Sequence, residues 1–99
     1  MRIIKRATNF KKDFKRVMAT PRHSRDVGPL LEDILAFLVA DEALPENYLD
    51  HALVGNWKGH RECHRECHIK PDLLLIYKTE ELDKLHLVRL GSHSELFKR

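Results

Sequence analysis

The chain has 99 residues, enough for one modest core, so we expect a single domain over residues 1–99. A composition of 42% hydrophobic and 33% charged residues is typical of a folded globular protein and argues against a disordered tail. The sequence shows neither an apolar run near the roughly 20 residues of a membrane helix nor an apolar N-terminal signal segment, so we expect a cytoplasmic protein without a membrane partner.

The net charge of +3 conceals an uneven distribution. Residues 1–25 contain nine Lys or Arg and one acid, whereas residues 32–50 contain six acids and neither Lys nor Arg. A basic N-terminal part suits a polyanionic ligand or a charged protein partner. A solvated helix face would give the same pattern, so charge alone does not choose between them.

The first half of the sequence predicts a strand and two helices. Residues 2–7 can form a short strand, and Thr8 or Asn9 can cap a helix that ends at Pro21. The apolar stripe of this helix is Phe10, Phe14, Val17 and Met18. Asp26 can cap a second helix, whose broad apolar face is Leu30, Leu31, Ile34, Leu35, Leu38 and Val39.

The second half predicts a sheet. Residues 44–57 lack periodicity and should form a structured loop, whereas residues 60–69, 73–78 and 85–90 read as three strands with short connections. The C-terminal SELFKR should form a turn of helix. We therefore expect an α+β domain of the order βααβββ, with two N-terminal helices packed on an antiparallel sheet and a short C-terminal helix.

Titratable side chains gather near the ends of the predicted strands. Of the seven histidines, all but His23 lie between positions 51 and 93. The candidates are His51, His64, His68, Asp72, Arg89 and His93. Cleavage of RNA by its own 2′-hydroxyl needs a base, an acid and cations around the phosphate, which histidine, aspartate and arginine can supply without a metal or other cofactor.

Three motifs carry a resemblance to a known family: DHALVGNWKG at 50–59, HIKPDLLLIYK at 68–78 and RLGSHSELF at 89–97. With the N-terminal FKKDFKR, they make the chain similar to the YafQ branch of the RelE superfamily of bacterial toxins over nearly its whole length. The resemblance implies a metal-independent endoribonuclease that cleaves messenger RNA in the ribosomal A site and is silenced by a cognate antitoxin.

The resemblance also implies which residues act. The family's functional positions fall on His51, His68, Asp72, His93 and Phe97. Asp72 is then expected to be the general base and His93 the general acid, while His51 and His68 hold the scissile phosphate. The further candidates for substrate binding are Arg89, Arg65, His64 and Phe97, the last by stacking on a base or, equally, by packing on the core.

The sequence departs from the family pattern at two places. Leu73 stands where some relatives carry an aromatic residue after the aspartate, and RECH occurs twice in tandem, at 61–64 and 65–68. Anchoring the register at the Pro71-Asp72 turn selects His68 as the family histidine. Keeping the spacing from Trp57-Lys58-Gly59 selects His64 instead and forces the extra unit to loop out or bulge.

Two other functions fit parts of the sequence. The segment 60–68 offers five potential zinc ligands, His60, Cys63, His64, Cys67 and His68, although zinc modules usually place two ligand pairs well apart. Alternatively, the four-residue insertion could leave a non-catalytic module that binds RNA or a protein partner on the same fold.

Overall fold

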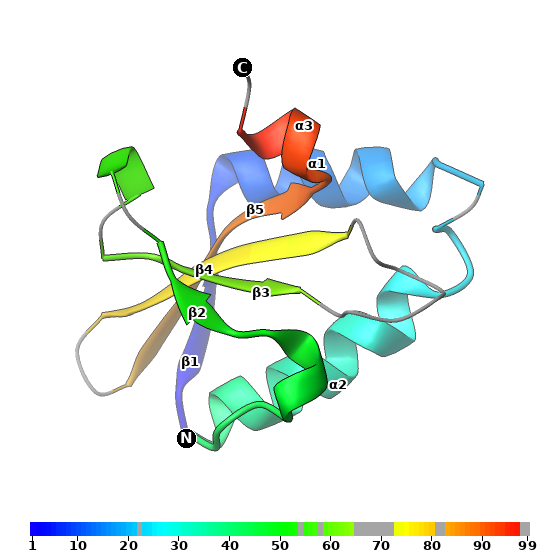
Figure 1. Ribbon diagram of the computed structural model, residues 1–99. Coiled ribbons are helices and arrows are strands. Elements are labelled where there is room, and N and C mark those ends of the chain that lie inside the picture. Colours follow the sequence, from blue (N-terminus) through cyan, green and yellow to red (C-terminus); the bar gives the residue numbers. More distant parts are fainter. Residues whose placement is uncertain (22, 54, 58, 65–72, 81–82, 98–99) are drawn as a thin grey trace.

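The computed structural model describes residues 1–21, 23–53, 55–57, 59–64, 73–80 and 83–97 (Figure 1). The elements run β1 (Ile3–Arg6), α1 (Thr8–Met18), α2 (Val27–Val39), η1 (Glu46–Tyr48), β2 (His51–Ala52), η2 (Gly55–Trp57), β3 (Arg61–His64), β4 (Leu74–Glu80), β5 (Lys84–Gly91) and α3 (His93–Leu96). The predicted α+β class and order of main elements are confirmed. Within these residues no helix is long and apolar enough to cross a membrane.

The described strands form one mixed sheet of order β1-β5-β4-β3-β2. The β2–β3, β3–β4 and β4–β5 pairs are antiparallel, as expected from their short connections, whereas β1 runs parallel to β5. The sheet is therefore not wholly antiparallel. Parallel strands need a long connection between them. The chain between β1 and the other strands contains α1 and α2, so it is long enough for β1 to run in the same direction as β5.

The predicted helices cover one face of this sheet. Phe10 and Val17 of α1 and Ile34 and Leu38 of α2 are buried against alternate residues of β4 and β5. The strand residues in this main core are Leu75, Tyr77, Leu85, Leu87 and Leu90. Met18, predicted in the apolar stripe, is 41% exposed because α1 ends there, three residues before Pro21.

The opposite face of the sheet, which we call the open face, carries a smaller apolar cluster. Leu74, Ile76 and Leu96 are buried there, with Trp57 and Phe97 packed against them. Side chains alternate between the faces of a strand, so Leu74 and Ile76 point away from α1 and α2 while Leu75 and Tyr77 point toward them. The short helix α3 follows β5 directly and lies beside α1 (Figure 1).

A β-bulge in β5 decides which face its last residues use. Tyr77 pairs with Leu87 and Ile76 with Arg89, so Val88 is the extra residue on β5. The bulge explains why the core leucines of this strand are spaced 85, 87 and 90 instead of strictly alternating. After the bulge, Leu90 belongs to the main core and Arg89 shares a register position with Ile76 of the open face.

Candidate active site

Two of the predicted site residues lie on one row across the sheet. His51 pairs with Glu62, Glu62 with Ile76, and Ile76 with Arg89. In the next row, two residues away along each strand, the backbone of His64 pairs with Leu74 and Leu74 pairs with Gly91. Gly91 lies two residues before His93. These rows therefore bring backbone positions that are far apart in sequence close together on the sheet.

The imidazole of His51 is exposed, and its orientation is defined by two oxygen atoms. Its Nδ1 lies 2.7 Å from the carbonyl oxygen of Leu49. A carbonyl can only accept, so Nδ1 carries the hydrogen and Nε2 is the nitrogen presented to the open face. Nε2 lies 4.0 Å from Oε1 of Glu62, an ion pair whenever the imidazole is protonated, and Glu62 itself is only 3% exposed.

The loop that carries His51 is held by its neighbour Asp50. Oδ1 and Oδ2 of Asp50 accept hydrogen bonds from the guanidinium of Arg61 at 3.3 and 3.2 Å, and Oδ1 accepts another from the Tyr77 hydroxyl at 2.6 Å. Burial and the bond to Asp50 raise the pKa of Tyr77, so the phenol stays protonated and remains a donor. The segment 44–57, predicted to be a loop, is thus ordered by contacts with β3 and β4, but it also contains the two-residue strand β2, which the prediction lacked.

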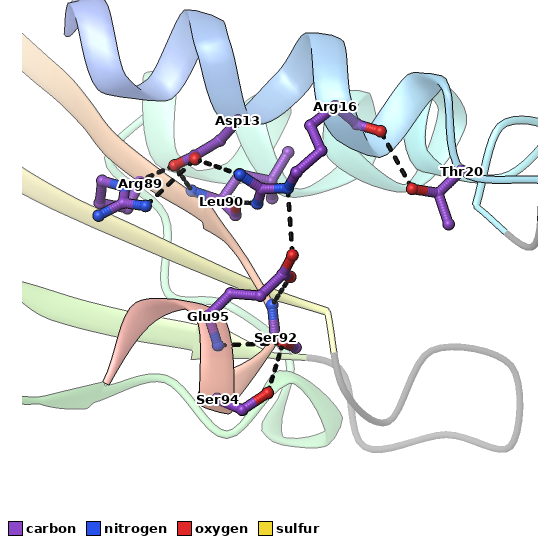
Figure 2. A network of polar contacts seen from close by, with 8 residues as sticks. All are labelled: Asp13, Arg16, Thr20, Arg89, Leu90, Ser92, Ser94 and Glu95. Atoms are coloured by element: carbon purple, nitrogen blue, oxygen red, sulfur yellow. Dashed lines mark hydrogen bonds and ion pairs between the residues drawn. The ribbon is translucent and has the colours of Figure 1, made fainter. Parts of the chain in front are cut away.

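Arg89 is anchored by a buried carboxylate. Its Nε donates to Oδ2 of Asp13 at 2.6 Å and its Nη2 to Oδ1 at 3.2 Å, in the two-bond arrangement shown in Figure 2. Asp13 is 3% exposed and also accepts from Arg16 Nη1 and the Leu90 backbone N–H. Burial alone would raise the pKa of Asp13, but hydrogen bonds from Arg89, Leu90 and Arg16 outweigh it and hold that pKa below its usual value.

His93 is the first residue of α3, and the residues around it form a capping box. Oε1 of Glu95 accepts from the Ser92 backbone N–H at 2.9 Å, and Oγ of Ser92 accepts from the Glu95 backbone N–H at 3.3 Å. The sequence Ser-His-Ser-Glu therefore defines where α3 begins. The Phe97 ring meets Trp57 edge to face at 6.3 Å, which gives it a packing contact, while its stacking on a base stays a prediction.

The strand pairing bears on the tandem repeat. The first RECH unit forms β3, in register with β4 from Arg61–Tyr77 to His64–Leu74. The second unit and the Pro-Asp turn, and with them Arg65, His68 and Asp72, lie outside the described residues. The predicted strand over 60–69 therefore corresponds to β3 at 61–64. This register is the one that keeps the spacing from Trp57 and favours His64 as the family histidine.

The register leads to a prediction about the repeat. The two units are identical, so removing either gives the same chain, in which RECH can still pair with β4 as β3 does now. We expect this shortened chain to fold with a free energy of unfolding within about 1 kcal/mol of the original, because loop length costs little entropy. Urea unfolding measures it. A chain that fails to fold would show that the second unit carries structure the first cannot supply.

The zinc hypothesis stays a prediction: within the described residues no group of three or more His, Cys, Asp or Glu side chains could hold a metal ion. Cys67 and His68 are not among these residues.

A cavity of about 270 Å³ lies next to α3, and its walls include Arg16, Thr20, His23, Leu73, Ser92 and Glu95. Leu73, the second departure from the family pattern, thus lines a hollow beside the start of α3.

Comparison with known proteins confirms the predicted family. A family model described as the bacterial toxin of type II toxin–antitoxin system, YafQ, matches residues 2–98. The mRNA interferase toxin YafQ of Escherichia coli K12 is 37% identical over 97 residues, covering 97% of this chain and 96% of that protein. The putative toxin YafQ of Haemophilus influenzae is 54% identical over 55 residues, which are 52% of this chain and 50% of that protein.

Solved structures give the same result. The E. coli DinJ–YafQ complex aligns with a TM-score of 0.76 and 36% identity over 98% of this chain and 99% of that one. A metal-bound toxin from Helicobacter pylori aligns with a TM-score of 0.81 and 41% identity over 98% and 100%. The fold and the sequence therefore define a toxin of a type II toxin–antitoxin system. Within that class, the chain belongs to the YafQ family.

Proposed function

We propose that this chain is a metal-independent endoribonuclease that cleaves messenger RNA on the ribosome and is neutralised by a cognate antitoxin. The observation that carries the proposal is the row of paired strand positions His51–Glu62–Ile76–Arg89, followed at the end of β5 by the helix start that carries His93. The name of the E. coli relative, mRNA interferase toxin, supports the choice of substrate.

The reaction we propose is attack by the 2′-oxygen on the adjacent phosphorus. Asp72 takes the 2′-proton as the 2′-O–P bond forms, and His93 gives a proton to the 5′-oxygen as the P–O5′ bond breaks. His51 and the histidine of the RECH segment, His64 or His68, hold the phosphate oxygens together with Arg89. Asp13 takes two N–H groups of the Arg89 guanidinium, which fixes the direction of its remaining donors.

A cognate antitoxin is the second part of the proposal. The E. coli relative crystallised in complex with DinJ, which supports a protein partner of this kind for the present chain. The exposed lysines of α1, Lys11, Lys12 and Lys15, offer a basic surface that an acidic antitoxin segment could cover. Such a partner would compete with RNA for the same charges.

The test is cleavage of messenger RNA in a translation extract by protein first treated with EDTA, with enough magnesium added back to keep ribosomes intact. We expect cuts in phase with codons, mapped by primer extension. Since one H. pylori relative was crystallised with copper, parallel reactions receive Cu²⁺ or Zn²⁺. Cleavage only with added metal would contradict metal independence. RNA binding without cuts would instead identify a non-catalytic module.

A further inference from the structure

We propose that Arg16 and Glu95 are positioning residues for the RNA cleavage reaction, because their ion pair fixes the start of α3 and thereby the backbone of His93. The inference rests on the proposed function and deepens it. Its physical basis is a chain of polar contacts from α1 to α3, drawn in Figure 2, that ends one residue before His93.

The two oxygens of the Glu95 carboxylate contact different partners. Oε1 accepts the Ser92 backbone N–H at 2.9 Å and closes the capping box around His93. Oε2 lies 3.1 Å from Nε of Arg16, so the same side chain joins the cap to α1. The hydrogen bond from the Ser92 N–H is the largest cause that lowers the pKa of Glu95, and the charge of Arg16 adds to it. The carboxylate therefore stays ionised near neutral pH.

Arg16 is in turn fixed at its other nitrogens. Nη1 donates to Oδ1 of buried Asp13 at 2.9 Å, and Nη2 donates to the carbonyl oxygen of Leu90 at 3.1 Å. The guanidinium thus bridges the carboxylate that anchors Arg89, the end of β5 and the cap of α3. A short helix of four residues has few internal hydrogen bonds of its own, so its orientation depends on contacts with the rest of the fold, and this ion pair is one of them beside buried Leu96.

The absence of a side chain at Gly91 leaves room for the Arg16–Glu95 ion pair. A Cβ atom at this position would lie 2.8 Å from Nη2 of Arg16 and 3.0 Å from Oε1 of Glu95. The ion pair therefore passes directly over the glycine that precedes Ser92 and His93. A side chain at position 91 would push the pair aside without removing either charge.

The pair is too exposed for stability to be its main effect. The side chains of Arg16 and Glu95 are 42% and 44% exposed, and ion pairs at such sites add little to folding free energy. A positioning role instead predicts a loss of rate, since a catalytic group displaced by a fraction of an ångström loses much of its effect. Rate and stability should therefore respond differently to the same substitution.

The experiment compares Glu95→Gln, Arg16→Gln, the double variant and Gly91→Ala with the original chain. Glutamine at 95 still accepts in the capping box but loses its charge, so only the brace is removed. We expect each single variant to lower kcat about tenfold with little change in KM, and the double variant to be no worse than either single one. Asp41→Asn, which breaks the separate Arg2–Asp41 ion pair at 2.7 Å, is the matched control.

A second readout does not need activity. The backbone amides at 95 and 96 are hydrogen-bonded to Ser92, and their hydrogen exchange should become about tenfold faster in Glu95→Gln and Arg16→Gln but not in Asp41→Asn. If the original chain cuts no RNA, the proposed function fails while this arm still tests the brace. Unchanged exchange and kcat in both variants would overturn the positioning role, as would a rate loss that only follows the unfolded fraction.

Discussion

Replacing His93 with glutamine should lower single-turnover cleavage of ribosome-bound messenger RNA by about 10²–10⁴-fold and leave the melting temperature unchanged. Glutamine is close to histidine in size but cannot deliver a proton to the leaving 5′-oxygen, so the loss equals the contribution of one general acid. His93 opens α3 with its backbone held by the neighbouring capping box, which does not depend on the imidazole. The same variant should be non-toxic when expressed without antitoxin.

His86→Gln is the matched control for this prediction. His86 lies on β5 among the residues paired with β1, and its Nε2 is 3.0 Å from the Glu80 carboxylate. Its loss should not alter the cleavage rate. Asp72→Asn should lower the cleavage rate by a factor similar to that of His93→Gln. It should remove the acidic limb of the pH–rate profile, which reports the general base, whereas His93→Gln should remove the alkaline limb, which reports the general acid. Undiminished cleavage by His93→Gln would remove His93 from the acid role.

Local periodicity predicted the elements of this fold but not how distant strands pair. The stripe of α1 and the apolar run at the start of β4 are enough to identify a helix and a strand from the sequence. The parallel β1–β5 pair joins residues about eighty positions apart, and no local pattern encodes such a contact. The bulge at Val88 was visible in principle, because leucines at 85, 87 and 90 break strict alternation.

The candidate site was predicted by resemblance more than by chemistry, and the supporting acids were missed. Asp13 looked like one more charge on a basic helix surface, yet it lies three residues after Phe10 and four before Val17, on the buried side. Glu62 was hidden inside the repeat, although alternation puts it in phase with position 64. Buried acids are informative because they require partners, and both of these lie beside residues predicted to bind the phosphate.

The carboxylate of Asp13 should be the most sensitive polar group in the fold. We expect Asp13→Asn to lower the free energy of unfolding by about 3 kcal/mol, because it leaves the guanidinium of Arg89 half-buried without its counter-ion. The side-chain amide would also set an N–H donor against the donors of Arg89 or Leu90, which now share Oδ2. For a chain of this size that loss lowers the melting temperature by roughly 12 °C or more, measured by calorimetry or circular dichroism.

The pH dependence separates this ion network from simple packing. The pKa of Asp13 is lower in the folded chain than its ordinary value, so the folded state binds fewer protons than the unfolded state between the two values, and the carboxylate's contribution grows as pH rises. The stability difference between the original chain and Asp13→Asn should therefore be constant above about pH 5 and shrink as pH falls below about 4. Asp41→Asn, at an exposed partner of Arg2, should show neither the large loss nor this pH dependence. A difference for Asp13→Asn that is equally large at pH 3 and pH 7 would mean that shape, not charge, makes this position sensitive.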